Sequence, residues 1–535
     1  MNHTFDEPVD VAVIGFGPIG ATLAALLGRR GRRVAVFDKS DQIYPLPRAF
    51  ALDHEAMRTF QELGIAGALA AHMTPYRPTI YQGADGKPIQ HFDMGPSPYP
   101  LAWAPSYTFN QPALEVSLRR AVSAMPSVSV HLGHEVVSAE QDGECATLSV
   151  QAPDGAAAPV RAPDGAAAPV RARYVVACDG GTSPTRKRLG LGLKSLEFDE
   201  PWIVVDMHVN EDMLDRLPAT NIQYCDPARP CTYVVGPGTH RRWEFLLLPH
   251  EAAHREMPHD AIWALLSPWL APHQARIWRA ATYRFHAVVL EQWRQQRVLL
   301  AGDAAHQMPP FLAQGMCQGL RDALNLAWKL DWVLRGEAPD TLLDSYGTER
   351  APQVEDTTQT VKRLGQIICE RDAERAAERD RGLRAQQGGE VRMQLRQSLL
   401  PGVRHGLIEG THGAAGTPFP QAVGQVGQQG AAQMMDDLLP RGFLLFLRDA
   451  PSREQFGRLA AGLQALHATA VCIGDAGNLE DLVGLAEADG VIARWFDQQG
   501  CGAALVRPDH VVYGVALDLD GAQALLERAR SKLSP

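Results

Sequence analysis

Residues 9–38, "VDVAVIGFGPIGATLAALLGRRGRRVAVFD", give the clearest indication of the fold. Residues 9–14 are apolar enough to form a buried strand, and a glycine-rich turn follows them directly. Residues 20–31 have helical character and stop at Gly31, and residues 32–38 predict a second strand. A strand–helix–strand unit of this length is typical of a mononucleotide-binding half, so we expect a Rossmann-like α/β domain here.

The turn between the first strand and the helix carries the pattern GxGxxG. Gly15 permits the tight turn, Gly17 lets a pyrophosphate approach the backbone, and Gly20 lets the helix and strand pack closely. Pro18 belongs to the same turn, whose helix start offers free N–H groups to phosphates. Asp38 ends the second strand, where an acid accepts hydrogen bonds from an adenosine ribose. GxGxxG alone is also compatible with a chance glycine loop, but the whole unit favours a dinucleotide.

Two later stretches also run from a buried strand into glycine and aspartate. "YVVACDGGTSPTRKRLG", residues 174–190, passes through Asp179 into a basic helix start. A third strand runs into Gly302 and Asp303, and "GDAAHQMPPFLAQGMCQG", residues 302–319, leads into an amphipathic helix. Taken alone, the first stretch is compatible with an ordinary strand–turn. The second is equally compatible with a glycine-rich helix start that merely permits close packing.

The remaining segments predict a multidomain chain. Short strands separated by turn residues predict an antiparallel sheet, and a later glycine-, glutamine- and proline-rich stretch predicts a linker. After it, strands alternate with helical stretches, as in a small α/β domain. The predicted boundaries are 1–195 and 285–400 for a discontinuous cofactor-binding domain, with part of 75–110 contributing to the substrate side, 196–284 for an inserted substrate domain, 401–424 for the linker and 425–535 for the C-terminal domain.

Composition excludes several classes of function. The 535 residues are 45% hydrophobic and 21% charged, which is ordinary for a globular protein, and the net charge of −10 with no basic stripe argues against nucleic acid. Residues 11–28 are uncharged, but glycines and a proline interrupt them and acidic residues precede them, which argues against a membrane span or signal peptide. The eight cysteines form no CxxC or zinc spacing, so we expect free thiols in a reducing cytoplasm and no metal site.

The three motifs, in this order and at this spacing, resemble those of the flavin-dependent aromatic hydroxylases related to para-hydroxybenzoate hydroxylase. The resemblance covers roughly residues 8–400. Within the family it is strongest to the 3-(3-hydroxyphenyl)propionate hydroxylases, on stretches such as "PRAFALDHEAMR", "NQPALE", "CDPARP" and "LAGDAAHQMPPFLAQGMCQGLRDALNLAWKL". The C-terminal segment resembles the thioredoxin-like domain that ends many members. It lacks a CxxC, so we expect no disulfide exchange there.

The resemblance implies FAD bound in a glutathione-reductase-like domain. Asp303 would hydrogen-bond the ribityl chain, Pro309 would pass beside the isoalloxazine ring, and the helix from Gly315 would favour negative charge on the reduced flavin. Arg48 would approach the pyrophosphate and Gln111 the ribityl chain, with a solvated loop residue and a helix cap as the respective alternatives. The implied cofactor-binding set is Gly15, Gly17, Pro18, Gly20, Asp38, Arg48, Gln111, Asp179, Gly302, Asp303, Pro309 and Gly315.

The resemblance also implies a reaction. NADH or NADPH would reduce FAD, O2 would add to give a flavin C4a-hydroperoxide, and a phenol ring activated by a base would take up its distal oxygen. Asp53 and His54 are the candidate bases, with a surface helix position as the alternative for His54. Tyr224 and His286 are candidate pocket residues, with strand-core roles as the alternative. His306 lies in the third motif, where we expect a backbone hydrogen bond.

We therefore expect an FAD-dependent, NAD(P)H-consuming monooxygenase that ortho-hydroxylates a phenolic acid, such as 3-(3-hydroxyphenyl)propionate or 3-hydroxycinnamate, to a catechol. The same chemistry on a resorcinol, an aminophenol or a polyketide remains open, as does a non-oxygenating flavin oxidoreductase. The halogenase motif WxWxxI is absent. No second GxGxxG marks a separate NAD(P)H domain, although the resemblance favours NADH. The expected partner is a small phenolic substrate, the expected location is the cytoplasm, and a homodimer is an open alternative.

One internal repeat stands apart from these motifs. "APDGAAAPVR" occurs at residues 152–161 and again at 162–171. Pro-Asp-Gly is turn chemistry, and a single repeat of this length is too short for a solenoid. We interpret it as a duplicated loop with no function of its own.

Overall fold

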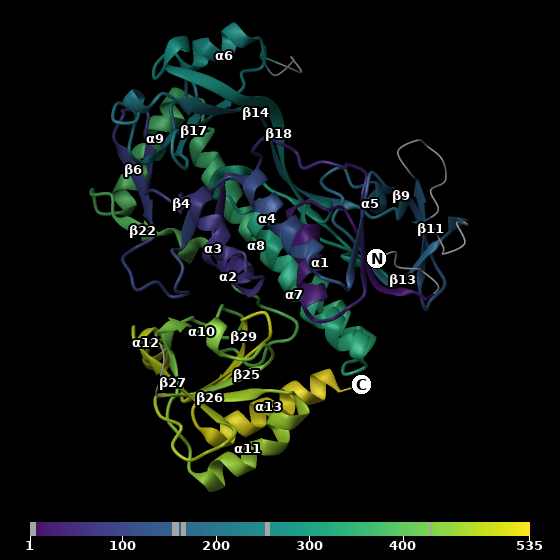
Figure 1. The fold of residues 1–535 in the computed structure, drawn as a ribbon. Coiled ribbons are helices and arrows are strands. Elements are labelled where there is room, and N and C mark those ends of the chain that lie inside the picture. The colour runs from purple at the N-terminus through teal and green to yellow at the C-terminus, as the bar shows by residue number, and fades with distance from the viewer. Residues whose placement is uncertain (1–6, 152–159, 162–166, 252–256, 428–430, 535) are drawn as a thin grey trace.

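The computed structural model describes residues 7–151, 160–161, 167–251, 257–427 and 431–534. It shows a mixed α/β fold built around two large sheets with a third sheet below them (Figure 1). The duplicated decapeptide lies largely outside the described residues. Within it, residues Val160–Arg161 pair with Ala167–Ala168 as antiparallel strands β11 and β12.

The first sheet has a parallel centre formed by segments far apart in the sequence. Its strands are almost wholly buried apolar residues, as expected where helices cover a parallel sheet. The central order is β20 (Val298–Leu300), β13 (Val170–Ala177), β1 (Val9–Ile14), β2 (Val34–Asp38) and β8 (Val128–Leu132), with β19 (Arg294–Gln295) antiparallel at one edge and β10 (Ala146–Gln151) and β9 (Glu135–Gln141) extending from β13. Each of the three motifs follows one of the three central strands, so their carboxyl ends meet at one edge of this sheet.

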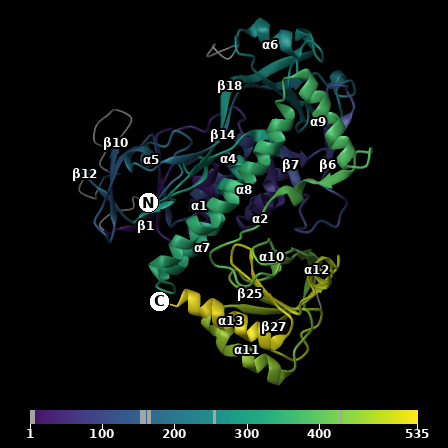
Figure 2. The same ribbon diagram turned by 180° about the vertical axis from the view of Figure 1, so that it is seen from behind.

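Three helices cover one side of this sheet. The first-motif helix α1 (Pro18–Arg29) packs against both α4 (Gln111–Ser123) and α7 (Gly315–Arg335). Helix α7 is buried along most of its length and ends at Gly336, whose φ of 74° is a left-handed C-cap. Helix α8 (Asp344–Ile368) then runs back across the molecule towards α9 (Ala373–Gln386), as the reverse view shows (Figure 2). These long helices tie the large sheets together.

The second large sheet has nine strands and two different faces. Its longest strands, β14 (Leu193–Val209) and β18 (Ala275–Leu290), pair antiparallel and reach back towards the first sheet. The full order is β21 (His306–Gln307), β18, β14, β17 (His240–Leu246), β16 (Cys231–Val235), β15 (Asn221–Tyr224), β5 (Thr79–Gln82), β6 (Pro88–Asp93) and β22 (Met393–Leu395). One face packs its aromatic and aliphatic side chains with α6 (His259–Leu266), while the opposite face is polar. Alternation with a period of two separates these faces.

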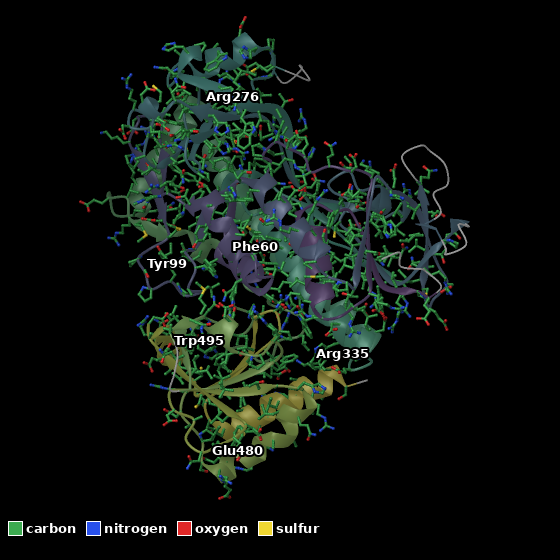
Figure 3. The ribbon with its side chains drawn as sticks, viewed as in Figure 1. Phe60, Tyr99, Arg276, Arg335, Glu480 and Trp495 are labelled. Carbon is green, nitrogen blue, oxygen red and sulfur yellow. The ribbon has the colours of Figure 1, made fainter. Side chains whose placement is uncertain are left out.

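Smaller elements complete this part of the molecule. A three-stranded sheet of β3 (Ala51–Asp53), β7 (Ser106–Phe109) and β4 (Met73–Pro75) leads into α2 (His54–Glu62) and α3 (Ala66–Leu69). Helix α5 (Pro184–Arg188) follows the second motif. Side chains fill the spaces between these elements, and Phe60 of α2 lies among them (Figure 3).

The C-terminal part has its own seven-stranded sheet. Helices α11 (Arg453–Ala465), α12 (Val491–Gln499), α13 (Leu519–Leu533) and the short α10 (Met435–Leu438) surround it. The strand order is β24 (Gln433–Met434), β23 (Val423–Val426), β27 (Leu482–Glu487), β26 (Thr469–Ile473), β25 (Leu444–Leu447), β28 (Ala503–Val506) and β29 (Val512–Ala516). The predicted linker, 401–424, has little regular structure but is packed: Phe419 is buried in the core of this sheet, and Val403 is buried as well.

Aromatic packing and buried ion pairs join the C-terminal sheet to the rest of the molecule. Phe443 packs edge-on against Trp328 and Trp332 of α7, with ring centroids 5.8 and 5.4 Å apart. Arg58 of α2 donates through Nη2 to Asp436 Oδ1 at 2.8 Å. The three sheets therefore share continuous packing. Within the described part of the chain, no helix is both long and apolar enough to cross a membrane.

Candidate active site

A cavity of about 920 Å³ lies between the first sheet and the polar face of the nine-stranded sheet. One wall is formed by residues of all three motifs and by two loop or helix residues predicted with them. Of the predicted cofactor-binding set, the residues that line it are Gly15, Gly17, Pro18, Asp38, Arg48, Gln111, Asp179, Asp303 and Gly315. Gly20, Gly302 and Pro309 lie beside the lining residues. The fold thus brings distant sequence motifs to one wall.

The glycines of the first motif differ in what surrounds them. Gly15 has a φ of 101°, and a Cβ there would lie 2.4 Å from the carbonyl oxygen of Cys178 on the neighbouring strand. A Cβ on Gly20 would lie 2.0 Å from the oxygen of Gly15, so this position requires close packing of helix and turn. Gly17 has no heavy atom within 4 Å of that position. The open space at Gly17, beside the start of α1, fits a phosphate group.

Asp38 closes the same turn from the second strand. Its Oδ2 accepts a hydrogen bond from Phe16 N at 2.6 Å, and its Oδ1 accepts one from Ser40 N at 2.8 Å. The carboxylate therefore shapes the glycine turn while lining the cavity. Arg119 of α4 lies nearby, with its guanidinium 5.0 Å from the Phe16 ring centroid. Its buried Nε has no hydrogen-bond partner among the described residues, which fits an anionic ligand in this part of the cavity.

The second motif is rigidly connected to the third. Asp179 accepts hydrogen bonds from Ser183 Oγ and, at 3.0 Å, from Thr185 N, so it fixes the start of α5. Arg186 then donates to the carbonyl oxygens of Gly181, at 3.1 Å, and of Ala304, at 2.9 Å. Because these bonds join the ends of two neighbouring strands, they set the spacing of the second and third motifs on one cavity wall.

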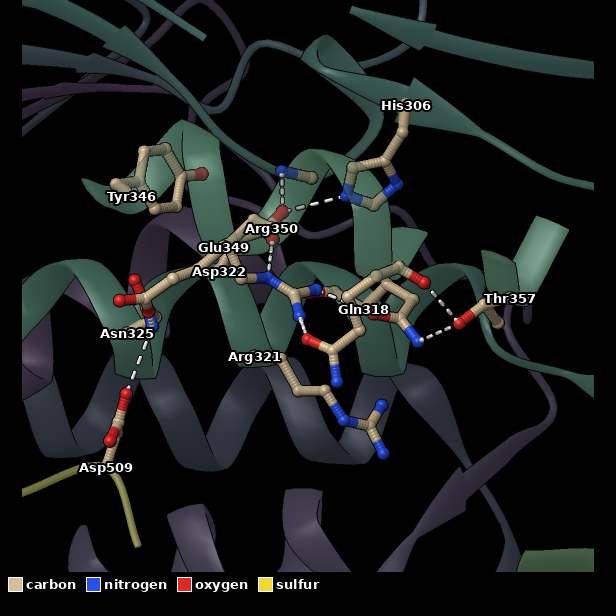
Figure 4. A network of polar contacts seen from close by, with 12 residues as sticks. His306, Gln318, Arg321, Asp322, Asn325, Tyr346, Glu349, Arg350, Thr357 and Asp509 are labelled. Atoms are coloured by element: carbon tan, nitrogen blue, oxygen red, sulfur yellow. Dashed lines mark hydrogen bonds and ion pairs between the residues drawn. The ribbon is translucent and has the colours of Figure 1, made fainter. Parts of the chain in front are cut away.

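The third motif is held from behind by a buried carboxylate. Asp322 of α7 accepts hydrogen bonds from Gly302 N at 2.9 Å and from Arg350 Nε at 2.8 Å, and its Oδ2 lies 2.8 Å from His306 Nε2 (Figure 4). Burial raises the pKa of Asp322, but His306 and Arg350 outweigh it and hold the pKa below its usual value. His306 therefore pairs with a carboxylate and not with the backbone, contrary to the sequence-based expectation. Asp303 is left exposed to the cavity.

Arg48 and Gln111 belong to one supporting contact. Gln111 Oε1 accepts hydrogen bonds from Ala49 N at 2.6 Å and Arg48 N at 3.3 Å, while its Nε2 donates to Glu115 at 2.8 Å. Gln111 is thus buried against the loop that carries Arg48, and the cap of α4 is Asn110 instead. Arg48 stays free to turn its side chain along the cavity, where it lies 5.4 Å from the Tyr44 ring centroid.

The opposite wall is the polar face of the nine-stranded sheet, with Asp206 at its centre. Arg242 donates to Asp206 through Nε at 2.8 Å and Nη2 at 2.9 Å, and His240 Nε2 lies 2.8 Å from Asp206 Oδ1. Although burial raises the pKa of Asp206, Arg242 and His240 hold it below its usual value. Arg242 and Arg279 also donate to the carbonyl oxygens of Arg48 and Pro47, respectively. These contacts fix the sheet against the loop of the cofactor wall.

Glu244 is the acid that this wall presents to the cavity. It follows Arg242 by two positions on β17 and lines the cavity, with its side chain 8% exposed. Burial raises the pKa of Glu244 to about 7, an effect that Arg242 opposes and Asp206 reinforces. The aromatic residues Tyr283 and Phe285 of β18 line the same wall. Together these residues form a surface that suits an aromatic ring with a polar substituent.

The structure places the predicted bases elsewhere. Asp53 caps α2, accepting from Ala56 N at 3.1 Å and from Arg321 at 2.6 Å, and it is 2% exposed. His54 is buried, not at the surface, and burial lowers its pKa. Neither residue lines the cavity, so their positions do not support a role as its base. The ion pair with Arg321 gives Asp53 a structural contact instead.

The two predicted pocket residues have different positions. Tyr224 does not line the cavity, and its hydroxyl accepts from Trp269 Nε1 at 3.3 Å on the apolar side of the sheet. His286 does line the cavity, at its solvent-exposed end, with Nδ1 3.3 Å from Asp199. Sequence reasoning missed Arg119, Arg242 and Glu244. Polar residues at alternate positions of 240–244 were the available signal for the latter two.

Comparison with known proteins agrees with this geometry. The family described as "FAD binding domain" matches residues 8–361, and "HcaD C-terminal domain" matches residues 416–531. The chain is 38% identical to a "Probable NADH-specific resorcinol 4-hydroxylase" of Rhodococcus jostii (strain RHA1), over 99% of this chain and 96% of that protein. It is 35% identical to a "3-(3-hydroxy-phenyl)propionate/3-hydroxycinnamic acid hydroxylase" of Burkholderia cenocepacia (strain HI2424), over 94% and 93% of the two chains.

Solved structures show the same fold at lower sequence identity. The flavin-dependent monooxygenase PieE, solved with FAD and substrate, superposes with a TM-score of 0.79 at 21% identity, covering 98% of this chain and 100% of PieE. Aklavinone-11 hydroxylase, solved with FAD and aklavinone, gives a TM-score of 0.74 at 22% identity, covering 99% and 100% of the two chains. With these coverages, the likenesses extend over both large sheets and the C-terminal sheet.

Proposed function

Because this chain belongs to the FAD-dependent aromatic hydroxylases, we propose that it adds one oxygen atom from O2 to a phenolic acid, ortho to the existing hydroxyl group. The first candidates are 3-(3-hydroxyphenyl)propionate and 3-hydroxycinnamate, named for the Burkholderia relative, and the product is a catechol. NADH is the proposed reductant, as named for the Rhodococcus relative. The observation that carries the proposal is one cavity walled by the three glycine-containing motifs on one side and a polar and aromatic sheet face on the other.

The cofactor wall fits FAD. We assign the diphosphate to the space at Gly17 and the start of α1, with Pro18 as the first helical residue and Gly15 and Gly20 shaping the turn. FAD, when bound, supplies hydride acceptance and oxygen activation. The remaining assignments are Asp38 to the ribose, Arg48 to the diphosphate, Gln111 and Asp303 to the ribityl side, and Asp179, Gly302, Pro309 and Gly315 to the backbone that surrounds the flavin.

The protein's own contribution is orientation and exclusion of water. Bonds from Arg242 and Arg279 to the loop at residues 47–48 hold the two walls together, so the ring would be enclosed between them. Enclosure protects an activated oxygen from loss to water. Arg284, at the exposed end of the cavity and paired with Asp199 at 3.1 Å, is a cation within reach of a substrate carboxylate entering there. We assign it the acid tail.

A second candidate is a neutral dihydroxybenzene such as resorcinol. Its support is the Rhodococcus relative's name and the buried acid Glu244, which suits a hydroxyl better than a nearby carboxylate. The two candidates share the reaction and differ in the group that the sheet wall must recognise.

We also propose that residues 425–535 form a thioredoxin-like domain without thiol chemistry. Its support is a sheet flanked by helices, and two buried cysteines without a CxxC. Burial raises the pKa of the Cys501 thiol to about 11, which keeps it protonated at neutral pH. For the other domains, we propose the same boundaries that the sequence predicts.

The test is NADH oxidation by the purified FAD-loaded protein with a panel of phenols. We expect 3-(3-hydroxyphenyl)propionate to speed NADH loss at least tenfold, about 1.4 kcal/mol of barrier, and to give the 2,3-dihydroxy product in near one-to-one ratio with NADH. If resorcinol speeds NADH oxidation and product formation more than 3-(3-hydroxyphenyl)propionate does, the second candidate is the substrate. Stimulation that yields mostly H2O2 would show an effector and not a substrate, and no response to any phenol would overturn the proposed function.

A further inference from the structure

Glu244 stands on the cavity side of β17 because of strand alternation. Its neighbours Trp243 and Phe245 point into the apolar core on the other face, whereas Arg242 shares the face of Glu244. Across the sheet, Glu244 lies opposite Val204 of β14 and Thr232 of β16. The carboxyl group is therefore carried by a central strand of a rigid sheet and directed into the cavity.

The protein supplies no hydrogen bond to this carboxyl group from any described residue. Arg242 Nη1 is 3.8 Å from Glu244 Oε1, and its other nitrogens bind Asp206. The hydroxyl of Thr232 donates instead to Gln223 Oε1 at 2.6 Å. A buried carboxyl group without a donor costs stability unless a ligand or water satisfies it. Apart from the ion pair with Arg242, no described residue contacts its oxygen atoms with a polar group, and a hydroxyl group in the cavity would supply a hydrogen-bond donor.

Its acidity suits proton transfer near neutral pH. Burial raises the pKa of Glu244 to about 7, and the charged groups packed around it are Arg242 on its own strand, Asp206 on β14 and Arg279 on β18. A general base works best when its pKa lies near the working pH. Phenols ionise near pH 10 in water, as tyrosine does, so a bound phenol needs such a base to react as phenolate.

We propose that Glu244 is the catalytic base of the hydroxylation, a role that rests on the proposed function. Its carboxylate accepts the hydrogen bond of the substrate hydroxyl and then takes that proton. The phenol O–H bond breaks, an O–H bond forms on Glu244, and the electron pair stays on the phenolate oxygen, which makes the ortho ring carbon more nucleophilic. The proton then passes from Glu244 to water, so the carboxylate is regenerated for the next turnover.

The test compares Glu244→Gln with the wild-type protein and with Glu211→Gln, a matched control on the exposed helical turn Glu211–Met213. Each FAD-loaded protein is assayed with 3-(3-hydroxyphenyl)propionate and with resorcinol for product, NADH and H2O2 over a range of pH. A ring-fluorinated resorcinol, which ionises at lower pH, is the third probe. Glu244→Asp is made in parallel, since it keeps the carboxyl group if the glutamine variant does not fold.

We expect Glu244→Gln to keep its FAD and to form product about a hundredfold more slowly, as is typical for loss of a general base. In the wild-type protein, product formation should fall as the pH drops below about 7, because the base becomes protonated, and the glutamine variant should lose this dependence. With the fluorinated probe, the difference in rate between Glu244→Gln and the wild-type protein should be at least tenfold smaller. Glu211→Gln should match the wild-type protein with every substrate.

Two results would overturn the assignment separately from the proposed function. If Glu244→Gln hydroxylates the substrate with the same rate and pH profile as the wild-type protein, Glu244 is not the base. A loss that the fluorinated phenol does not relieve, or that comes with lost FAD, would show a structural role. If Glu244→Gln fails to fold, Glu244→Asp must show the fluorinated-probe relief, or the assignment fails. Absence of any hydroxylation by the wild-type protein would instead overturn the proposed function itself, and the assignment with it.

Discussion

Asp38 both stabilises the glycine turn and lines the cavity at its cofactor end. It accepts a backbone hydrogen bond from Phe16 in the glycine turn and lines the space that we assign to the adenosine ribose. We predict that Asp38→Ala weakens FAD binding by about 1–3 kcal/mol, the usual worth of a charged hydrogen bond. Fluorescence titration of the FAD-free protein measures this directly. An unchanged Kd would remove Asp38 from the site, and Asp41→Ala on the following loop serves as the control.

Arg284 decides between the two substrate candidates. Its guanidinium is about half exposed and pairs with Asp199 at the open end of the cavity, whereas Arg242 is buried and bound to Asp206. We predict that Arg284→Gln raises the KM for 3-(3-hydroxyphenyl)propionate about tenfold or more and leaves the KM for resorcinol unchanged, because resorcinol has no carboxylate. Steady-state kinetics with both phenols make the comparison. Equal effects on the two would show that Arg284 does not hold the acid tail.

At the residue scale, the sequence predicts a position at the site best where that position follows from a local pattern. Gly17 and Asp38 sit within one strand–helix–strand unit, and their placement on the cavity wall needs no distant contact. Glu244 was not recognised from the sequence, because whether it lines the cavity depends on which face of the sheet lies against the cofactor wall. Asp53 was assigned to the cavity from a likeness, but its neighbour Arg321 is 268 residues away and binds it in the interior.

Helices α7 and α8 take part in a buried contact of charged side chains between the C-terminal sheet and the rest of the molecule. Arg507, which follows β28, donates to Glu349 of α8 at 2.8 Å and to Asp509, while Lys329 of α7 lies 2.8 Å from the same Glu349 carboxylate. Asn325 of α7 donates to both Glu349 and Asp509, as Figure 4 shows in part. One helical turn away on α7, Asp322 holds the third motif.

We predict that Arg507→Met lowers the free energy of unfolding by about 3–5 kcal/mol, because it leaves Glu349 and Asp509 buried without their main cation. Urea unfolding monitored by fluorescence gives the value. Arg528→Met is the control: Arg528 is half exposed and pairs with Glu409, so we expect less than about 1 kcal/mol there. Equal changes in the two variants would contradict the account of this buried contact.

The same cluster makes the free energy of unfolding depend on pH. Burial raises the pKa of Glu349, but Arg507 and Lys329 outweigh it and lower the pKa to about 2. A carboxylate whose folded pKa is depressed contributes stability above its unfolded pKa and loses it as the pH falls towards the folded value. We therefore expect the difference between wild type and Arg507→Met to be present at neutral pH and to shrink on acidification between about pH 4 and pH 2.

Among the helices and strands, the sequence predicted the strand–helix–strand unit best and the pairing of strands that are distant in the sequence least well. Residues 9–38 form the predicted strand, helix and strand. Strands β5 and β6 join the nine-stranded sheet from far upstream, with β5 pairing in parallel to β15, and no local pattern specifies such a partner. The linker was predicted from its glycine, glutamine and proline content, yet Phe419 within it is fully buried in the core of the C-terminal sheet.

At the scale of the whole molecule, two sheets form the cavity and the third braces the helices behind it. Arg276, near one end of the nine-stranded sheet, and Glu480, in the C-terminal part, lie at opposite ends of the molecule (Figure 3). Between them, α7 begins at the cavity and runs to the C-terminal sheet, where Trp332 packs on Phe443. The residues that we assign to the cofactor and to the phenol therefore line one cavity between the two sheets.

The central claim is that this cavity transfers one oxygen atom from O2 to a phenol. The most direct measurement supplies the FAD-loaded protein with NADH, 3-(3-hydroxyphenyl)propionate and O2 of the heavy isotope, and analyses the product by mass spectrometry. We predict a catechol that carries a single heavy oxygen atom, in near one-to-one ratio with the NADH consumed. NADH oxidation that leaves the phenol unlabelled and the oxygen as H2O2, with resorcinol giving the same result, would contradict the account.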